Sequence, residues 1–197
     1  GADLRRATAQ RANLSDVNCQ GSDLREIDLW GADLSGANFS EANLSGAKTI
    51  LIDVVCNGTS FHLTDLSHAN LSESHLSQGT DFTEANLRKT NLDDAYLCGS
   101  ILKFADLREA RLVNARLGDA FGSVDLSGAD LRDLEAEGAD FTGANLVGAK
   151  IQRAYLGAAN LTGANLSKAT LTRANLTKAI LVETNLTHTD LTDCNIY

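Results

Sequence analysis

The sequence contains neither proline nor methionine, and it has one tryptophan and four cysteines in 197 residues. Cys19, Cys56, Cys98 and Cys194 lack the CxxC spacing of a zinc or redox site and are too few for a disulfide scaffold. We expect free thiols, which favour a reducing compartment such as the cytoplasm only slightly. No apolar run approaches the ~18 residues of a membrane span, so membrane insertion is not expected.

The chain also lacks a basic excess. Its net charge of −9 argues against direct binding to nucleic acid or to anionic lipid. Gly1 stands inside a repeat and no initiator methionine precedes it, which indicates a trimmed or processed product. The compartment therefore stays open, because a removed targeting segment is one alternative.

What is present is a period of five residues. It is clearest in residues 138–186, where Ala, then Asn or Asp, then Leu or Phe, is followed by two small or polar residues. A period of five fits neither an α-helix nor a β-strand. Each repeat has a small inward residue and, two positions later, a large central one. This spacing indicates a chain that turns a corner at every repeat.

The phenylalanines define the length of one coil. The central positions include five of them: Phe39, Phe61, Phe82, Phe121 and Phe141. In the count of repeats these five are separated by multiples of four. Four repeats therefore form one coil of about twenty residues, and the five rings are predicted to form one buried ladder. Phe104 falls off this ladder and is expected on the surface.

The repeat register shifts at three places. The count predicts two extra residues near 55–60, one extra near 77–81, and one fewer near 118–120, where Asp119 takes an inward position. It assigns Thr49 and Val54 to central positions. On this assignment all three shifts occur at the same corner, just ahead of the phenylalanine column, as bulges.

Units such as ADLSG, ANLSG, ADLRE and ANLTG resemble the pentapeptide repeat family over residues 2–196. The resemblance implies an all-β fold, a right-handed quadrilateral parallel β-helix, with residues 1–197 as a single domain of about ten coils. It departs from the family pattern where small residues hold central positions, at Ala9, Thr49 and Ala136. Such arrays are abundant in cyanobacteria, so the resemblance implies a cyanobacterial-type protein.

Neither end carries a recognisable cap. Each coil buries its apolar side chains only by stacking on a neighbour, so an open end exposes unpaired backbone and apolar residues. Two explanations stay open: caps were removed, or an end packs against another copy in end-to-end self-association.

No constellation of catalytic residues is evident. His62, His68 and His75 share one coil but are predicted on different walls, and no second group is placed to orient any of them. The same dispersion argues against a metal site. We predict no enzymatic activity, no cofactor and no bound metal.

Two classes of function remain. The resemblance implies DNA mimicry as one alternative, because some relatives modulate DNA gyrase by presenting an acidic rod. One predicted wall carries only Asp or Asn before its central residues, but Arg5, Arg25, Arg88 and Arg108 follow two positions later. A duplex ~48 Å long carries roughly 28 phosphate charges, far more than the net −9 of this chain. We favour a non-enzymatic structural or protein-interaction module.

The predicted partner contact is a set of large side chains at outward positions. Tyr96, Ile101 and Phe104 lie close together in the sequence, and the column of Tyr96 continues through Arg116 and Tyr155. Apolar residues where Asn and Asp are the rule indicate a contact with a protein partner of unknown identity. Scattered surface residues without a role are the alternative.

Overall fold

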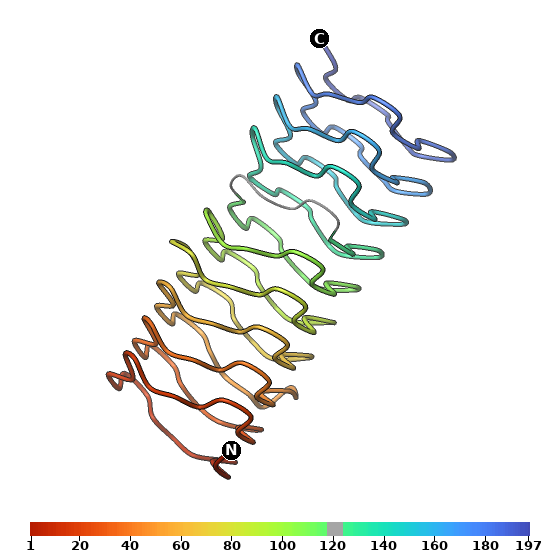
Figure 1. The fold of residues 1–197 in the computed structure, drawn as a ribbon. Coiled ribbons are helices and arrows are strands. Elements are labelled where there is room, and N and C mark those ends of the chain that lie inside the picture. Colours follow the sequence, from red (N-terminus) through yellow and green to blue (C-terminus); the bar gives the residue numbers. More distant parts are fainter. Residues whose placement is uncertain (118–123) are drawn as a thin grey trace.

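A computed structural model describes residues 1–117 and 124–197. The backbone forms an elongated stack of similar coils, with the N-terminus at one end and the C-terminus at the other (Figure 1). In both described ranges the backbone has neither an α-helix nor a strand longer than one residue; it has isolated parallel β-bridges separated by turns. No helix in this part of the chain could cross a membrane.

The bridges form four columns along the stack. Bridging residues recur about every five residues, and each pairs with the residue one coil further on. We number the columns walls 1 to 4, beginning at Asp3, Thr8, Asn13 and Asn18. On wall 1, the Leu24 N–H donates to the Asn43 carbonyl at 2.8 Å. Each coil therefore has four sides and is bonded to the next coil on every side.

The walls meet at tight turns. The Ala37 N–H donates to the Leu34 carbonyl at 2.9 Å, which closes one such turn. The third turn residue has a left-handed backbone, with φ 69° at Gly36, 61° at Glu26 and 60° at Phe104. A positive φ at this position is typical of type II turns. The corners thus accept both glycine and residues with long side chains.

The interior contains the large central residues and the small residues two positions before them. The Phe39 and Phe61 rings stack with centroids 5.4 Å apart, and the Phe61 and Phe82 rings stack at 5.1 Å. Phe141 is equally buried, whereas Phe104 is 57% exposed. Phe121 lies outside the described residues.

Threonine and serine replace alanine at some small inward positions without leaving an unpaired hydroxyl. Thr64 Oγ1 donates to the Phe39 carbonyl at 2.7 Å, and Ser74 Oγ donates to the Leu51 carbonyl at 2.7 Å. Each accepting carbonyl belongs to the preceding coil. These hydroxyls enter the core because a hydrogen-bond partner offsets their loss of water.

The predicted register near residues 55–60 is wrong. Asn43 follows Asp23 by twenty residues on wall 1, but Ile50 follows Asp28 by twenty-two on wall 2. The two extra residues therefore lie between Asn43 and Ile50. Leu51 takes the central position instead of Thr49, and both are fully buried.

Packing explains this outcome. Leu51 and Cys56 are five residues apart, as are Thr49 and Val54, so the period alone allows either pair at the centre. The larger Leu51 fills the core better. Thr49 suits the small position because its Oγ1 donates to the Ser45 carbonyl at 3.1 Å and accepts the Glu26 N–H at 3.0 Å.

A second register shift lies near residues 77–81. One extra residue lies between His75 and Asp81, because Val55 pairs with His75 but Ser60 pairs with Asp81. The expectation of a single shared corner is wrong, since this shift separates walls 3 and 4 and the first separates walls 1 and 2. The predicted shift near 118–120, with Asp119, lies outside the described residues.

We expect Phe82→Ala to lower the free energy of unfolding by about 3–5 kcal/mol, because it leaves a cavity beneath a stacked ring. Phe104→Ala removes an exposed ring and serves as the control, with little expected change. Chemical denaturation of both variants followed by circular dichroism tests the difference. Equal stability of the two variants would contradict the ladder.

Candidate interaction surfaces

Wall 1 carries an unbroken column of Asp and Asn at its bridging positions. The column consists of Asp3, Asp23, Asn43, Asp65, Asn86, Asp106, Asp125, Asn145, Asn165 and Asn185. Their Oδ1 atoms accept the backbone N–H two residues later, at 3.0 Å for Asn43 with Ser45 and for Asp65 with Ser67. The same bond recurs on the other walls. Asp and Asn are therefore explained by a local turn bond, without any ligand.

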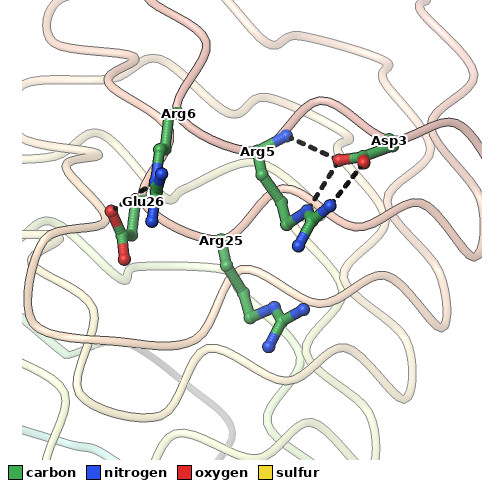
Figure 2. A pocket seen from close by; sticks show the side chains of 5 residues that line it. All are labelled: Asp3, Arg5, Arg6, Arg25 and Glu26. Carbon is green, nitrogen blue, oxygen red and sulfur yellow. Dashed lines mark hydrogen bonds and ion pairs between the residues drawn. The ribbon is translucent and has the colours of Figure 1, made fainter.

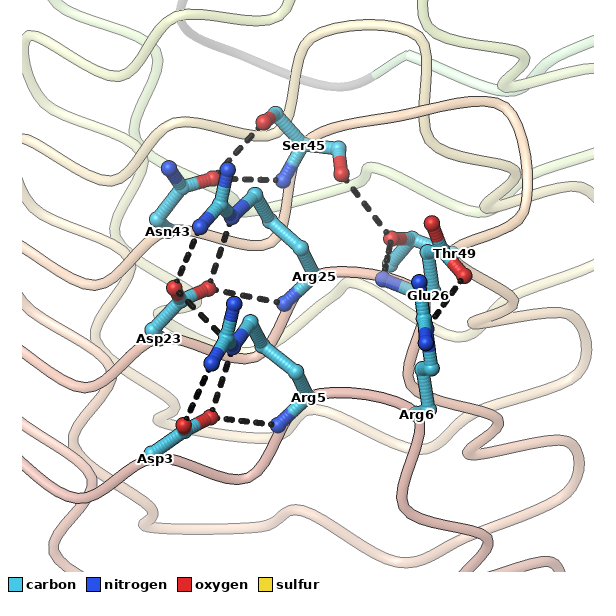
Figure 3. Close-up of polar contacts among 9 residues, drawn as sticks. All are labelled: Asp3, Arg5, Arg6, Asp23, Arg25, Glu26, Asn43, Ser45 and Thr49. Atoms are coloured by element: carbon cyan, nitrogen blue, oxygen red, sulfur yellow. Dashed lines mark hydrogen bonds and ion pairs between the residues drawn. The ribbon is translucent and has the colours of Figure 1, made fainter.

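Arginines pair with the aspartates at the N-terminal part of wall 1. Arg5 binds Asp3 through two nitrogens, at 2.9 and 2.7 Å, and Arg25 repeats the arrangement with Asp23 at 2.9 and 2.6 Å. Figure 3 shows the two pairs one above the other, with Asn43 and Ser45 continuing the rows in the next coil. Arg5 Nε also lies 3.7 Å from Asp23 of the following coil.

A shallow hollow of about 350 Å³ lies beside these pairs. The hollow is lined by Asp3, Arg5, Arg6, Arg25 and Glu26 (Figure 2). Arg6 Nε lies 3.1 Å from Glu26 Oε2. Hydrogen bonding from Arg5 lowers the pKa of Asp3 to about 2, and Arg25 lowers the pKa of Asp23 in the same way. The acidic groups here are neutralised by arginine, so this surface does not resemble a row of free phosphates.

Wall 3 carries the predicted aromatic column. The His75 and Tyr96 rings stack in parallel with centroids 5.0 Å apart. On the other face of Tyr96 lies the Arg116 guanidinium, 5.1 Å from the ring centre, and Arg116 Nε lies 3.0 Å from Glu135. Tyr155 follows Glu135 in the same column and is 57% exposed. The structure thus brings Tyr96, Arg116 and Tyr155 onto one wall.

Ile101 and Phe104 do not join that wall. Ile101 bridges to Asp81 on wall 4 and is 44% exposed. Phe104 lies at the corner beyond wall 4, where the Lys103 ammonium is 5.2 Å from its ring centre. The five predicted contact residues therefore form two groups on adjacent sides of the coil.

Sequence reasoning missed part of the wall 3 surface. It considered His75 only as a catalytic or metal-binding candidate, although His75 lies in the same column as Tyr96, one coil earlier, and its ring stacks on that tyrosine. It also missed three exposed carboxylates, Asp53, Glu73 and Asp94, that occupy the corner before wall 3 in consecutive coils. The incorrect register near Thr49 concealed this row, since Asp53 is a corner residue only when Leu51 is central.

The histidines show no catalytic arrangement in the described residues. His62 Nδ1 lies 3.0 Å from the Thr83 carbonyl, and His75 contacts Tyr96 by stacking. Within 1–117 and 124–197, no three His, Cys, Asp or Glu side chains are grouped to hold a metal ion. Cys19 and Cys56 are buried, and Cys98 is exposed.

Comparison with known proteins supports the repeat assignment. The sequence model described as pentapeptide repeats matches residues 12–48, 47–78, 79–119, 121–157 and 159–196. The crystal structure of HetL, a pentapeptide repeat protein involved in heterocyst differentiation regulation from the cyanobacterium Nostoc sp. strain PCC 7120, is similar with a TM-score of 0.85 and 33% identity. The alignment covers 96% of this chain and 87% of HetL. No curated protein sequence matches.

Two further solved structures are less similar. QnrB1, a plasmid-mediated fluoroquinolone resistance protein, is 16% identical in a trypsin-treated form, with 100% of this chain and 92% of that chain covered and a TM-score of 0.47. A pentapeptide repeat protein from the Arabidopsis thaliana thylakoid lumen is 27% identical over 68% of this chain and 67% of its own, with a TM-score of 0.32. These two TM-scores support no conclusion about this chain.

We expect acid to weaken the fold through its Asp–Arg pairs. Hydrogen bonding from the Arg132 side chain lowers the pKa of Asp130. A lowered folded-state pKa contributes stability above the unfolded value near 3.8, and that contribution is lost as the pH falls through the folded value. The thermal midpoint should therefore decrease from pH 6 to pH 2.

Asp130→Asn provides the matched control. It keeps an Oδ1 acceptor for the Arg132 N–H, and it removes the charge together with the Oδ2 acceptor of the Arg132 guanidinium. Its midpoint should be lower than that of the native protein at pH 6 and should depend less on pH. A native midpoint that stays constant from pH 6 to pH 2 would contradict the prediction.

Proposed function

Because the chain belongs to the pentapeptide repeat family, we propose that it is a non-enzymatic protein-interaction module. It acts as a rigid right-handed quadrilateral β-helix of about ten coils that presents flat polar walls and a small apolar surface to a protein partner. HetL, a pentapeptide repeat protein of similar structure, is involved in heterocyst differentiation regulation, a role that is compatible with such a module.

The observation that carries the proposal is the exposure of large side chains that the core does not use. Tyr155 and Phe104 are each 57% exposed. Phe104 also has a φ of 60°, a conformation that costs a bulky residue roughly 1–2 kcal/mol. Folding does not account for an exposed ring at a strained position, whereas a partner contact does.

DNA mimicry is the less favoured alternative. On wall 1, Asp3, Asp23 and Asp106 are paired with arginine, and half of the column is uncharged Asn. We expect purified DNA gyrase to supercoil DNA at the same rate with and without this protein. Inhibition of supercoiling, or protection of gyrase from a quinolone, would favour mimicry over the proposed module.

Substitution of the two exposed groups tests the interaction surface. Tyr96→Ser with Tyr155→Ser changes wall 3, and Ile101→Ser with Phe104→Ser changes wall 4 and the corner beyond it. A protein captured by affinity is identified, and its dissociation constant is then measured against each variant. At least one variant should weaken binding by several kcal/mol, since buried aromatic anchors commonly dominate binding energy.

The thermal midpoint should change little, because these side chains lie outside the stacked core. Ile180→Ser with Val182→Ser is the matched control, since both residues are exposed and apolar but lie near the C-terminal end of wall 4, several coils from Ile101 and Phe104. Unchanged affinity in both test variants would leave Tyr96, Ile101, Phe104, Arg116 and Tyr155 as surface residues without a partner.

A further inference from the structure

The exposed rings of wall 3 are bordered by uncompensated negative charge. Asp53, Glu73 and Asp94 lie two residues before Val55, His75 and Tyr96 in consecutive coils, and all three carboxylates are exposed. In the described residues none of them forms an ion pair with Lys or Arg. Asp94 accepts a hydrogen bond from Asn114 at 2.6 Å, which leaves its charge in place.

Several other acidic residues nearby are paired with arginine. On the same corner, Asp133 is bound by Arg153, and Asp93, next to Asp94, is bound by Arg111. Further along wall 3, Glu135 is paired with Arg116 at 3.0 Å. Among the described acidic residues of this corner, Asp133 and Asp193 thus have an arginine partner, and the three beside His75 and Tyr96 have none.

Rings and carboxylates line a common depression. A hollow of about 420 Å³ is bounded by Asp53, Glu73, His75, Asp94 and Tyr96. Both faces of Tyr96 are covered, by His75 and by the Arg116 guanidinium, so an occupant meets its edge and hydroxyl. The occupant must offer positive charge to the carboxylates and apolar surface to the rings.

We propose that wall 3 binds a basic, extended segment of a protein partner, with lysine or arginine side chains over Asp53, Glu73 and Asp94. This inference rests on the proposed interaction function and specifies its partner. Charge complementarity favours a basic occupant. A second copy of this chain is disfavoured, because each copy carries a net charge of −9 and would place like charges against this row.

The dimensions fit such a segment. Successive coils are about 4.8 Å apart, so the three carboxylates span about 10 Å along the stack. Alternate side chains of an extended chain are about 7 Å apart, so two flexible lysines on one face of the segment reach all three carboxylates. The residues between them would turn away from the wall.

A labelled peptide of about eight residues, in which lysine alternates with alanine, is the probe. Fluorescence polarisation measures its affinity for the full chain at low salt, and a peptide with glutamate in place of lysine is the control ligand. We expect binding of the lysine peptide only, weakened as salt screens the charges. The triple variant Asp53→Asn, Glu73→Gln and Asp94→Asn should weaken binding of the lysine peptide about tenfold or more. A tenfold loss corresponds to about 1.4 kcal/mol of binding free energy.

A second triple variant controls for overall charge. Glu41→Gln with Asp140→Asn and Glu183→Gln makes the same change in net charge around wall 4 and the corner beyond it. It should alter the affinity less than about twofold, because its charges lie at and beside wall 4, away from the row that the peptide would contact. Equal losses in the two variants, or no loss in the first, would overturn the proposal.

Failure of this inference is distinguishable from failure of the proposed function. If Tyr96→Ser with Tyr155→Ser weakens a captured partner while the carboxylate variant does not, the interaction module stands and the basic segment is excluded. If sedimentation shows dimers that the tyrosine variant abolishes, the occupant is a second copy and the inference is overturned. If neither variant affects any binding, both proposals fail for wall 3.

Discussion

Stacking of one coil on the next is the interaction on which the whole structure depends. The N–H of each central residue donates to a carbonyl one coil further on, as Leu24 does to Asn43 and Leu66 does to Asn86, both at 2.8 Å. Single bridges of this kind give little cooperativity alone. Repeated on four walls, they hold the coils at the spacing at which central side chains fill the interior, so backbone bonding and core packing stabilise each other.

That constraint decides what each repeat position accepts. The centre must be large and apolar, and the position two before it must be small or carry a hydroxyl that reaches a carbonyl, as Thr64 does. The residue before the centre is mostly Asp or Asn because its side chain caps the following turn, as in Asn43 with Ser45. Most of the chain's polarity therefore follows from folding, and acidic residues on the walls need no ligand to explain them.

Function must then be sought where residues depart from these rules. Phe104 is an aromatic residue at a left-handed corner position, where most residues are glycine or polar, and Tyr155 stands in a column that ends in asparagines. Asp53, Glu73 and Asp94 lack the arginine partners that Asp133 and Asp193 have on the same corner. None of these features improves the stacking of coils, which is why the proposed contact surface is built on them.

The sequence by itself determined the period of five, the four repeats of each coil and the membership of the pentapeptide repeat family. Each of these follows from which residue types recur at which intervals along the chain. It also placed Tyr96, Arg116 and Tyr155 in one column. Only the tertiary structure decided the register around Thr49, because two assignments share the same period and differ in how well Leu51 fills the core and how Thr49 satisfies its hydroxyl. The row of Asp53, Glu73 and Asp94 beside the stacked His75 and Tyr96 depends on that register. The proposed site, which combines residues of consecutive coils, could therefore be located only once the packing of the core was known.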